Sequence, residues 1–234
     1  MITRAAVVPH PPLLVPELVV GAAAETEPVR AATLAAAGKL PGPWVAVAVD
    51  DSGPSTYSPP LSGTFLGYGV DVPVSLGGDL PPDARIPLPV LVTAWLREHC
   101  GVEVSRVELV PPDLPASDCV SFGQQLAAEV NSGSESEDVG LLFLGDGSTR
   151  HGPRSPGSDD ERSGPFDSLV HTLLANADVY GLLGLDVGLA RELGAQGRAA
   201  WQVLAGVPGP WRGLGAEFFA PFGVGYHVAV WERP

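Results

Sequence analysis

The chain has 234 residues, 45% of them hydrophobic and 17% charged, so it is long enough to bury a substantial core as one domain. Its formal net charge of −14 argues against nucleic acids and anionic membrane surfaces, because both bind clustered Lys and Arg. The two cysteines, Cys100 and Cys119, form no CxxC pair. The sequence therefore indicates neither a disulfide framework nor a thiolate zinc site, and it favours a cytoplasmic location.

The apolar stretch after Arg4 is broken by prolines, among them Pro9, Pro11 and Pro16. An export signal has an unbroken apolar core, so we expect no export. The rest of the sequence contains no uninterrupted run of about 18 apolar residues, so we expect no membrane span.

The first fifty residues predict a strand, a helix and a second strand. Residues 2–8 are partly β-branched and end at a Pro-rich turn, which is typical of a strand. Residues 19–37 are Ala-rich and favour a helix, whose start we place near Pro28 because proline suits the first helical position. The apolar run at residues 44–49 is typical of a strand covered on both faces.

The next segment predicts a loop, a helix and a strand. Residues 55–87 are rich in Pro, Gly and Ser, which indicates a long ordered loop with short strands. Residues 89–99 repeat apolar side chains at helical spacing and end before Gly101, a typical helix stop. Residues 104–110 alternate well enough for a strand.

A capped helix and a buried strand follow. Residues 119–130 fit a helix whose cap is Ser117 or Asp118. The acidic, Ser-rich residues 131–138 predict a solvated loop, and residues 139–144 predict a buried strand.

The last third begins with a charged, Pro- and Gly-rich loop at residues 154–164, for which mobility is the simpler interpretation and a lid the functional one. Residues 166–175 and 182–193 predict helices, residues 201–205 a less clear element, and residues 226–231 a late strand. This largely alternating order predicts a single α/β domain with a central mixed or mostly parallel sheet flanked by helices.

Polar groups follow three of the predicted strands: His10, the pair Asp50 and Asp51, and the pair Asp146 and His151. Ligands of such sheets bind at the carboxyl ends of strands, so these residues are the candidates for chemistry. The prolines around His10 restrict its backbone, which favours a preorganised ligand at the mouth of a pocket over a structural histidine in a turn.

The turn after residue 144 offers the carboxylate of Asp146, the hydroxyl of Ser148 and the imidazole of His151 for acid–base work. Neither a Walker motif nor a GxSxG elbow is present, and a simple Gly/Asp turn with a solvated His151 is the alternative. Asp50 and Asp51 suit a divalent metal, but also an ordinary turn.

The remaining histidines carry weaker predictions. His99 lies at a helix C-terminus and His171 inside a helix, so both are expected to be structural. His227 belongs to the late strand, and its pattern leaves open whether it faces a pocket or solvent.

Four motifs in this order, AAVVPHPPLLVPE, FLGDGSTRH, PFDSLVHTLLANAD and PFGVGYHVAVW, together resemble the class III extradiol ring-cleavage dioxygenases, specifically their LigB-like catalytic subunits. The resemblance spans nearly the whole chain as one domain, residues 1–234. It implies a non-haem Fe(II) held by two histidines and a glutamate, a further histidine as acid/base, and a catechol as substrate. An iron site of that kind leaves positions open for substrate and dioxygen.

In this resemblance His10 matches the first iron-binding histidine and His151 the acid/base histidine. No histidine follows the strand at residues 44–49, and residues 194–200, where the glutamate is expected, contain no acid. Asp50 or Asp51 is a candidate replacement for the histidine, and Glu192 or Glu217 for the glutamate.

Two hypotheses follow. The first is a ring-opening, metal-dependent enzyme with His10 and Asp50 or Asp51 on Fe(II) or another divalent metal, and His151 and Asp146 as catalytic groups. The second is a family member without cofactor or catalysis that binds a small molecule or regulates. In both, the partner is a small-molecule ligand and a homo-oligomer remains possible.

Overall fold

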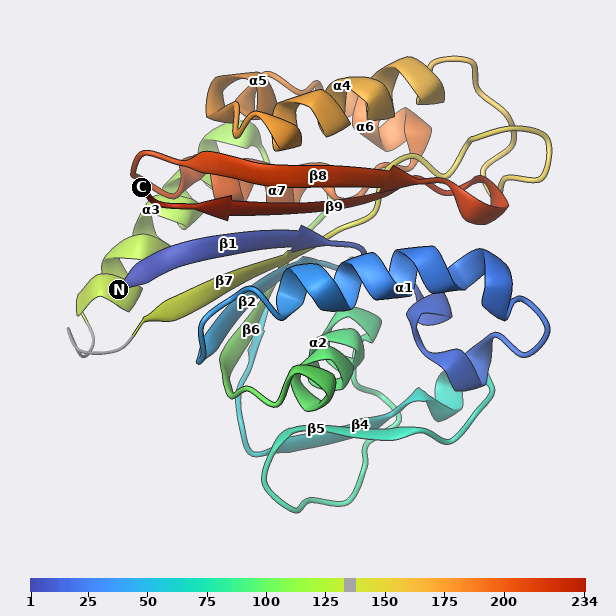
Figure 1. Cartoon of the computed structure of the whole chain (residues 1–234), viewed down its shortest axis with the longest axis vertical. Helices are drawn as coiled ribbons and strands as arrows, with labels where there is room; N and C mark the ends of the chain where they lie inside the picture. Colours follow the sequence, from blue (N-terminus) through green and yellow to red (C-terminus); the bar gives the residue numbers. More distant parts are fainter. Residues whose placement is uncertain (133–137) are drawn as a thin grey trace.

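The computed structural model describes residues 1–132 and 138–234. Its main feature is a seven-stranded mixed sheet with the strand order β3-β6-β2-β7-β1-β9-β8, and a separate two-stranded sheet, β4-β5, packs against helix α2 (Leu88–Cys100) (Figure 1). The strands are β1 (Ile2–Val8), β2 (Trp44–Val49), β3 (Ser55–Tyr57), β4 (Leu61–Thr64), β5 (Pro73–Gly77), β6 (Val104–Val110), β7 (Val139–Leu144), β8 (Arg212–Phe219) and β9 (Tyr226–Glu232).

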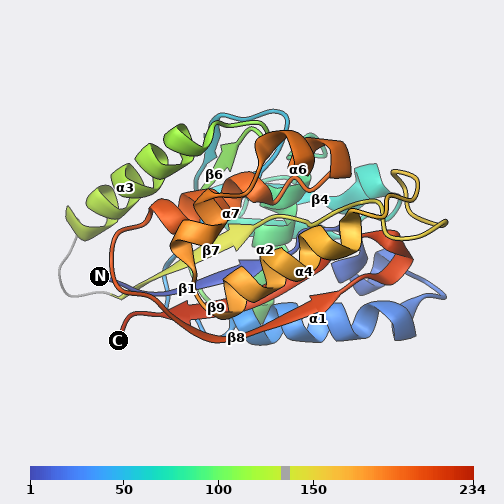
Figure 2. The same ribbon diagram turned by 90° about the horizontal axis from the view of Figure 1, so that it is seen from above.

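Helices cover both faces of the sheet (Figures 1 and 2). Those on one face are α1 (Ala23–Ala37) and α2 (Leu88–Cys100). Those on the other are α3 (Ala116–Ser132), α4 (Ser163–Ala175), α5 (Val179–Leu183), α6 (Val187–Leu193) and α7 (Arg198–Gly206). The predicted single α/β domain with a mixed sheet is therefore confirmed.

The apolar composition of the central strands follows from this two-sided cover. Every residue of β2 is buried, and alternate residues enter opposite cores, with Val45 and Val47 on the α3 and α7 side and Ala46 and Ala48 on the α1 and α2 side. A strand covered on both faces has no position for a polar side chain, so polar residues collect where the strand ends.

The four parallel strands β6, β2, β7 and β1 end at one edge of the sheet. From β1 the chain passes to α1, whereas from the adjacent β7 it leads to α4 on the opposite face. The chain diverges in the same way after β2 and β6, toward α2 and α3. Such divergence opens a crevice at the carboxyl ends, where ligands of this fold class bind.

The predicted helix boundaries were wrong at two starts. Helix α1 begins at Ala23 and carries Pro28 inside it, since burial of Val29, Ala32 and Ala36 offsets the one hydrogen bond that the proline removes. Helix α3 begins at Ala116, so Ser117 and Asp118 lie inside its first turn and do not precede it.

The second half contains three further corrections. The helix predicted over residues 182–193 is two helices. Helix α5 ends at Leu183, with Gly184 as its C-cap, and a new helix begins because the Asp186 side chain accepts the Leu189 N–H and caps α6. The unclear element at 201–205 is helix α7. Strand β8 was missed, because its half-exposed, Gly-containing sequence lacks an apolar alternation.

The acidic loop predicted over residues 131–138 lies largely outside the described residues, although Asn131 and Ser132 belong to α3. Within the described ranges, no helix is long and apolar enough to cross a membrane.

Candidate acid–base site

His10 and Asp146 lie side by side at the ends of β1 and β7. The His10 backbone N–H donates to Asp146 Oδ1 over 3.0 Å, which ties the two strand ends together. The His10 side chain is buried, and its Nδ1 has no hydrogen-bond partner. The Asp146 carboxylate also lies near Tyr226, and burial followed by this charge raises the pKa of the Tyr226 phenol. Asp146 thus fixes a backbone turn.

Asp50 and Asp51 follow β2, which β7 separates from β1. Asp50 Oδ1 accepts hydrogen bonds from the backbone N–H and the hydroxyl of Ser52, at 2.9 and 2.6 Å, as a turn-forming aspartate does. Asp51 is exposed at the rim of a cleft of about 490 Å³ between the ends of β2 and β6 on one side and α6 with the segment after it on the other. His10 and His151 do not line this cleft.

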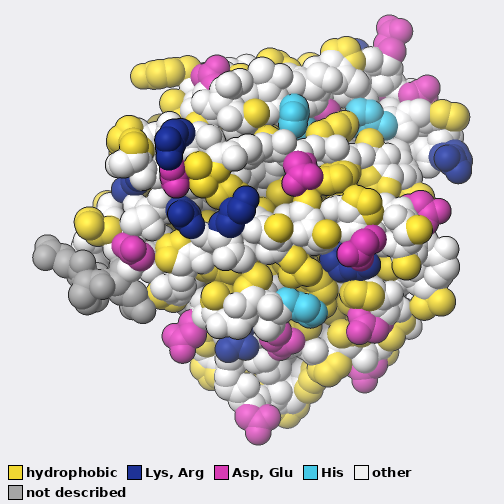
Figure 3. Space-filling model, viewed as in Figure 1, with side chains coloured by type: hydrophobic (Ala, Val, Ile, Leu, Met, Phe, Trp, Pro, Cys, Tyr) yellow, Lys and Arg dark blue, Asp and Glu magenta, His cyan; other side chains and the backbone are white. Residues whose placement is uncertain are grey.

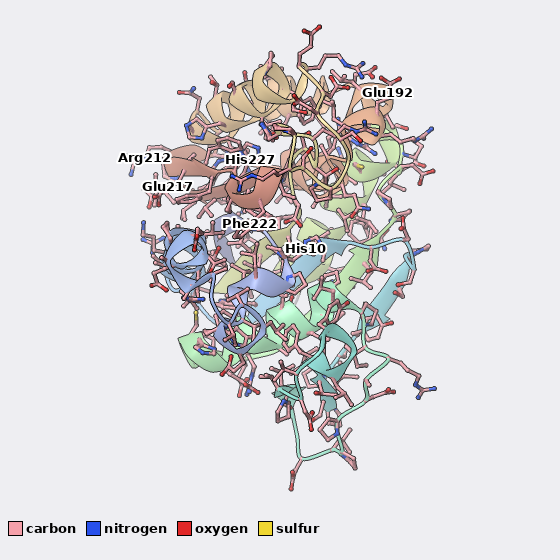
Figure 4. All side chains as sticks on the ribbon, turned by 90° about the vertical axis from the view of Figure 1, so that its right-hand side faces the viewer. His10, Glu192, Arg212, Glu217, Phe222 and His227 are labelled. Carbon is pink, nitrogen blue, oxygen red and sulfur yellow. The ribbon has the colours of Figure 1, made fainter. Side chains whose placement is uncertain are left out.

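The donor set does not fit the iron centre that the sequence resemblance implies. Among the described residues, no three His, Cys, Asp or Glu side chains are placed to hold a metal ion. Glu192 forms an ion pair with Arg162, and Glu217 is exposed on β8. Figure 4 shows both glutamates well away from His10. Neither Glu192 nor Glu217 therefore lies close enough to His10 to replace the missing glutamate ligand.

A buried carboxylate, Asp167 on α4, links two histidines from distant parts of the chain. The side chain of Asp167 is fully buried. Its Oδ2 accepts from His151 Nε2 over 2.6 Å and its Oδ1 from His227 Nε2 over 2.9 Å. The backbone N–H of Ser148 donates to the same carboxylate, at 3.1 and 3.4 Å. These donors compensate for removing the charge from water.

His227 is the buried partner of this pair, with 1% of its surface exposed. Burial lowers its pKa below the ordinary 6.5, although the hydrogen bond to Asp167 opposes that shift. Burial and the single pairing of Nε2 with Asp167 both favour a neutral His227 that donates its Nε2 proton. Its ring is held edge-on by Trp201, with ring centres 5.3 Å apart, and flanked by Phe218 at 4.9 Å.

His151 is the accessible partner, with 18% of its side chain exposed. Its backbone N–H donates to Gly223, and its ring lies 5.8 Å from that of Phe218. Phe222 precedes that glycine, is 49% exposed, and has a left-handed backbone with φ 57°. Such a conformation is costly for a residue with a side chain and is often found at functional sites.

Two glycines let the main chain approach the carboxylate closely. A Cβ at Gly147 would lie 2.5 Å from Asp167 Oδ1, and one at Gly225 would lie 2.5 Å from Oδ2. The two glycine segments also bond to each other, since the Gly147 N–H donates to the Gly225 carbonyl over 2.7 Å. The site is therefore built from β7, α4 and β9 together.

The predicted site residues thus lie in three separate places. His10 meets Asp146 and His151 meets Asp167, whereas Asp50 and Asp51 join neither pair. His99 bonds to the Trp95 carbonyl at the end of α2, in keeping with a structural role. The space-filling view shows histidine side chains at separate places on the face seen in Figure 1 (Figure 3).

The sequence reasoning missed Asp167, Phe218 and Phe222. Asp167 did carry a signal: it lies on the buried side of α4 with Phe166 and Val170, where an unpaired carboxylate is not tolerated. Its partners were not foreseeable, because they come from a loop and a strand 16 and 60 residues away.

Comparison with known proteins supports the fold alone. No protein-family model and no curated protein matches the sequence. Among solved structures, the chain is similar to an uncharacterized protein, JW3007, from Escherichia coli K12. The TM-score is 0.51 and the identity 14%, over 97% of this chain and 99% of that one.

Proposed function

We propose that this protein binds a catechol-type small molecule beside His151 without a three-ligand iron centre, and that His151 exchanges a proton with a phenolic hydroxyl. The observation that carries the proposal is the 2.6 Å hydrogen bond from His151 Nε2 to the fully buried Asp167. An imidazole oriented by a buried carboxylate is a common general base.

The reacting atom in this proposal is His151 Nδ1. Because Nε2 donates its proton to Asp167, a neutral His151 has its lone pair on Nδ1, and no described residue bonds to that atom. Nδ1 accepts the phenolic proton, which leaves a phenolate beside an imidazolium that Asp167 stabilises. Asp146 remains a turn-forming residue in this account.

The aromatic class of the ligand is supported by Phe218, whose ring centre lies 5.8 Å from that of His151. Phe218 is 36% exposed, and Phe222, which precedes the glycine that bonds to the His151 backbone, is 49% exposed, so both rings have open surface to pack against a planar ligand. This combination of aromatic surface and base agrees with the catechol that the sequence resemblance implies.

A titration with 4-nitrocatechol tests the proposal, since its visible absorption changes when it loses a proton. Chelator-treated protein should bind the probe and raise the absorption of the ionised form. His151→Gln should weaken binding at least tenfold, about the effect of losing one hydrogen bond to a charged group. His99→Gln, on α2, is the matched control and should bind as the unmodified chain does.

Two results would overturn the proposal. One is binding by His151→Gln that equals that of His99→Gln. The other is a protein that does not bind 4-nitrocatechol until Fe(II) is added anaerobically. Such a protein would then retain the metal and cleave the catechol ring when oxygen is admitted. That outcome would favour the ring-opening dioxygenase with His10 as a ligand.

A further inference from the structure

The Asp167 carboxylate makes an arrangement that a single acid–base histidine does not require. Each of its two oxygens accepts one imidazole N–H, from His151 at 2.6 Å and from His227 at 2.9 Å. The second imidazole is buried and cannot meet a ligand itself. A reason for its presence must lie in what it does to the carboxylate.

We propose that His227 is a positioning residue for His151, which acts through the Asp167 carboxylate that the two imidazoles share. By occupying Oδ1, His227 fixes the rotation of the carboxylate, so that Oδ2 stays aimed at His151 Nε2. This holds His151 in the Nε2–H tautomer and leaves Nδ1 as the base. This inference deepens the proposed function. Its expected effect on ligand binding rests on that function, whereas its expected effect on the His151 tautomer does not.

The packing around His227 supports a fixed orientation. Trp201 from α7 meets the ring at an interplanar angle of 87°, and Phe218 from β8 flanks it at 36°. Neither carries a charge. The charged or titratable groups that act on His227 are Asp167 and His171 from α4 and His151 from the loop after β7. A ring held in this way donates along one direction only.

The protonation of His227 also favours a fixed hydrogen bond to Asp167. Its Nδ1 is buried without a partner, so a proton there would be an unsatisfied buried donor, whereas a proton on Nε2 is paired with Asp167. The neutral Nε2–H form is therefore the stable one. It supplies a hydrogen bond without adding a second positive charge beside His151.

Long-range 1H–15N correlation spectra of the histidine rings test the inference without any ligand. At pH 8 the unmodified chain should show both His151 and His227 protonated at Nε2. Protonation of His227 at Nδ1 would overturn the inference, and no variant is needed for that result.

A pair of variants separates positioning from packing. His227→Phe keeps a ring of similar size but removes the donor, whereas His227→Gln keeps an N–H near the position of Nε2. His227→Phe should show His151 as a mixture of tautomers and bind 4-nitrocatechol about five- to tenfold more weakly. His227→Gln should restore the single tautomer and most of the affinity.

The failures of the two proposals are distinguishable. If His227→Phe keeps the unmodified tautomer of His151, the positioning role is wrong, whatever binds at the site. If the tautomers change as expected but the unmodified chain does not bind 4-nitrocatechol, the positioning role stands and the proposed ligand is wrong. If His227→Phe does not fold, the spectra of the unmodified chain and of His227→Gln decide.

Discussion

The segments after β7 and after β2 both lie at the carboxyl edge of the sheet, and they differ in the contacts that they make. After β7 the main chain at Ser148 and the ring of His151 meet the buried Asp167, which also bonds to β9. After β2, the side-chain hydrogen bonds of Asp50 go to Ser52, two residues away. The first arrangement needs the whole fold, whereas the second is a local turn.

This difference separates a candidate for chemistry from a structural turn. A carboxylate without water is costly unless several donors face it, so the Asp167 cluster ties stability to function. Asp50 remains in contact with solvent, so it should contribute little to stability or to function. Substitutions in the two regions should therefore have very different effects.

The largest effect is expected at Asp167. Asp167→Ala leaves the N–H groups of Ser148 and His227 buried without an acceptor and removes the hydrogen-bond partner of His151 Nε2. These losses should lower the free energy of unfolding by about 3–5 kcal/mol. Urea unfolding followed by tryptophan fluorescence measures it. A loss below about 1 kcal/mol would contradict the described network.

A methyl group added beside the carboxylate should have the next largest effect. In Gly225→Ala the new Cβ would lie 2.5 Å from Asp167 Oδ2, so the segment before β9 or the carboxylate must shift, at a cost of about 1–3 kcal/mol in unfolding free energy. Gly164→Ala is the control, since the residue is helical and an added Cβ would meet nothing within 4 Å beyond the adjacent residues and the backbone of its own helix. That variant should be neutral or slightly stabilised, and equal losses in both would refute the close approach.

The buried His227 should make stability depend on pH. Its pKa in the folded state lies below the ordinary 6.5 because of burial, so below pH 6.5 the unfolded chain binds more protons than the folded one. This contribution to stability is complete above pH 6.5 and is lost as the pH falls from there toward the folded-state value. Unfolding midpoints in urea between pH 7.5 and 5 should fall less steeply for His227→Phe; identical slopes would count against the assignment.

The smallest effect is expected after β2. Asp50→Ala removes two hydrogen bonds from an exposed turn and should cost at most about 1 kcal/mol, with 4-nitrocatechol binding unchanged. Asp51→Ala should have no measurable effect on stability. If either variant abolished probe binding, the comparison between the two strand ends would be reversed.

Local patterns predicted most of the fold. The apolar runs of β2 and β7 and the helical spacing of α2 need only neighbouring residues, and all three elements formed where predicted. Strand β8 has no such local pattern and forms because β9 pairs with it over seven positions, from Arg212 to Phe219. Tertiary pairing of this kind leaves little trace in a single sequence.

The candidate site was only half predictable for the same reason. His151 follows a buried strand and could be singled out by that position alone. Asp167 and His227 lie on a helix and a strand whose approach depends on the complete sheet, and Gly147 and Gly225 matter only once that approach has occurred. The expected metal ligands were His10, Asp50 and Asp51, because each follows a predicted strand. The sequence does not reveal the order of the strands in the sheet, in which β7 lies between β1 and β2.

The most direct test of the central claim compares bound ligand with bound metal. Preparations with different iron contents, from chelator-treated to Fe(II)-loaded, are titrated with 4-nitrocatechol, and metal and ligand are counted in each. Our account predicts one ligand per chain at every iron content. Ligand bound in proportion to iron would contradict it and would make His151 an accessory to a metal centre.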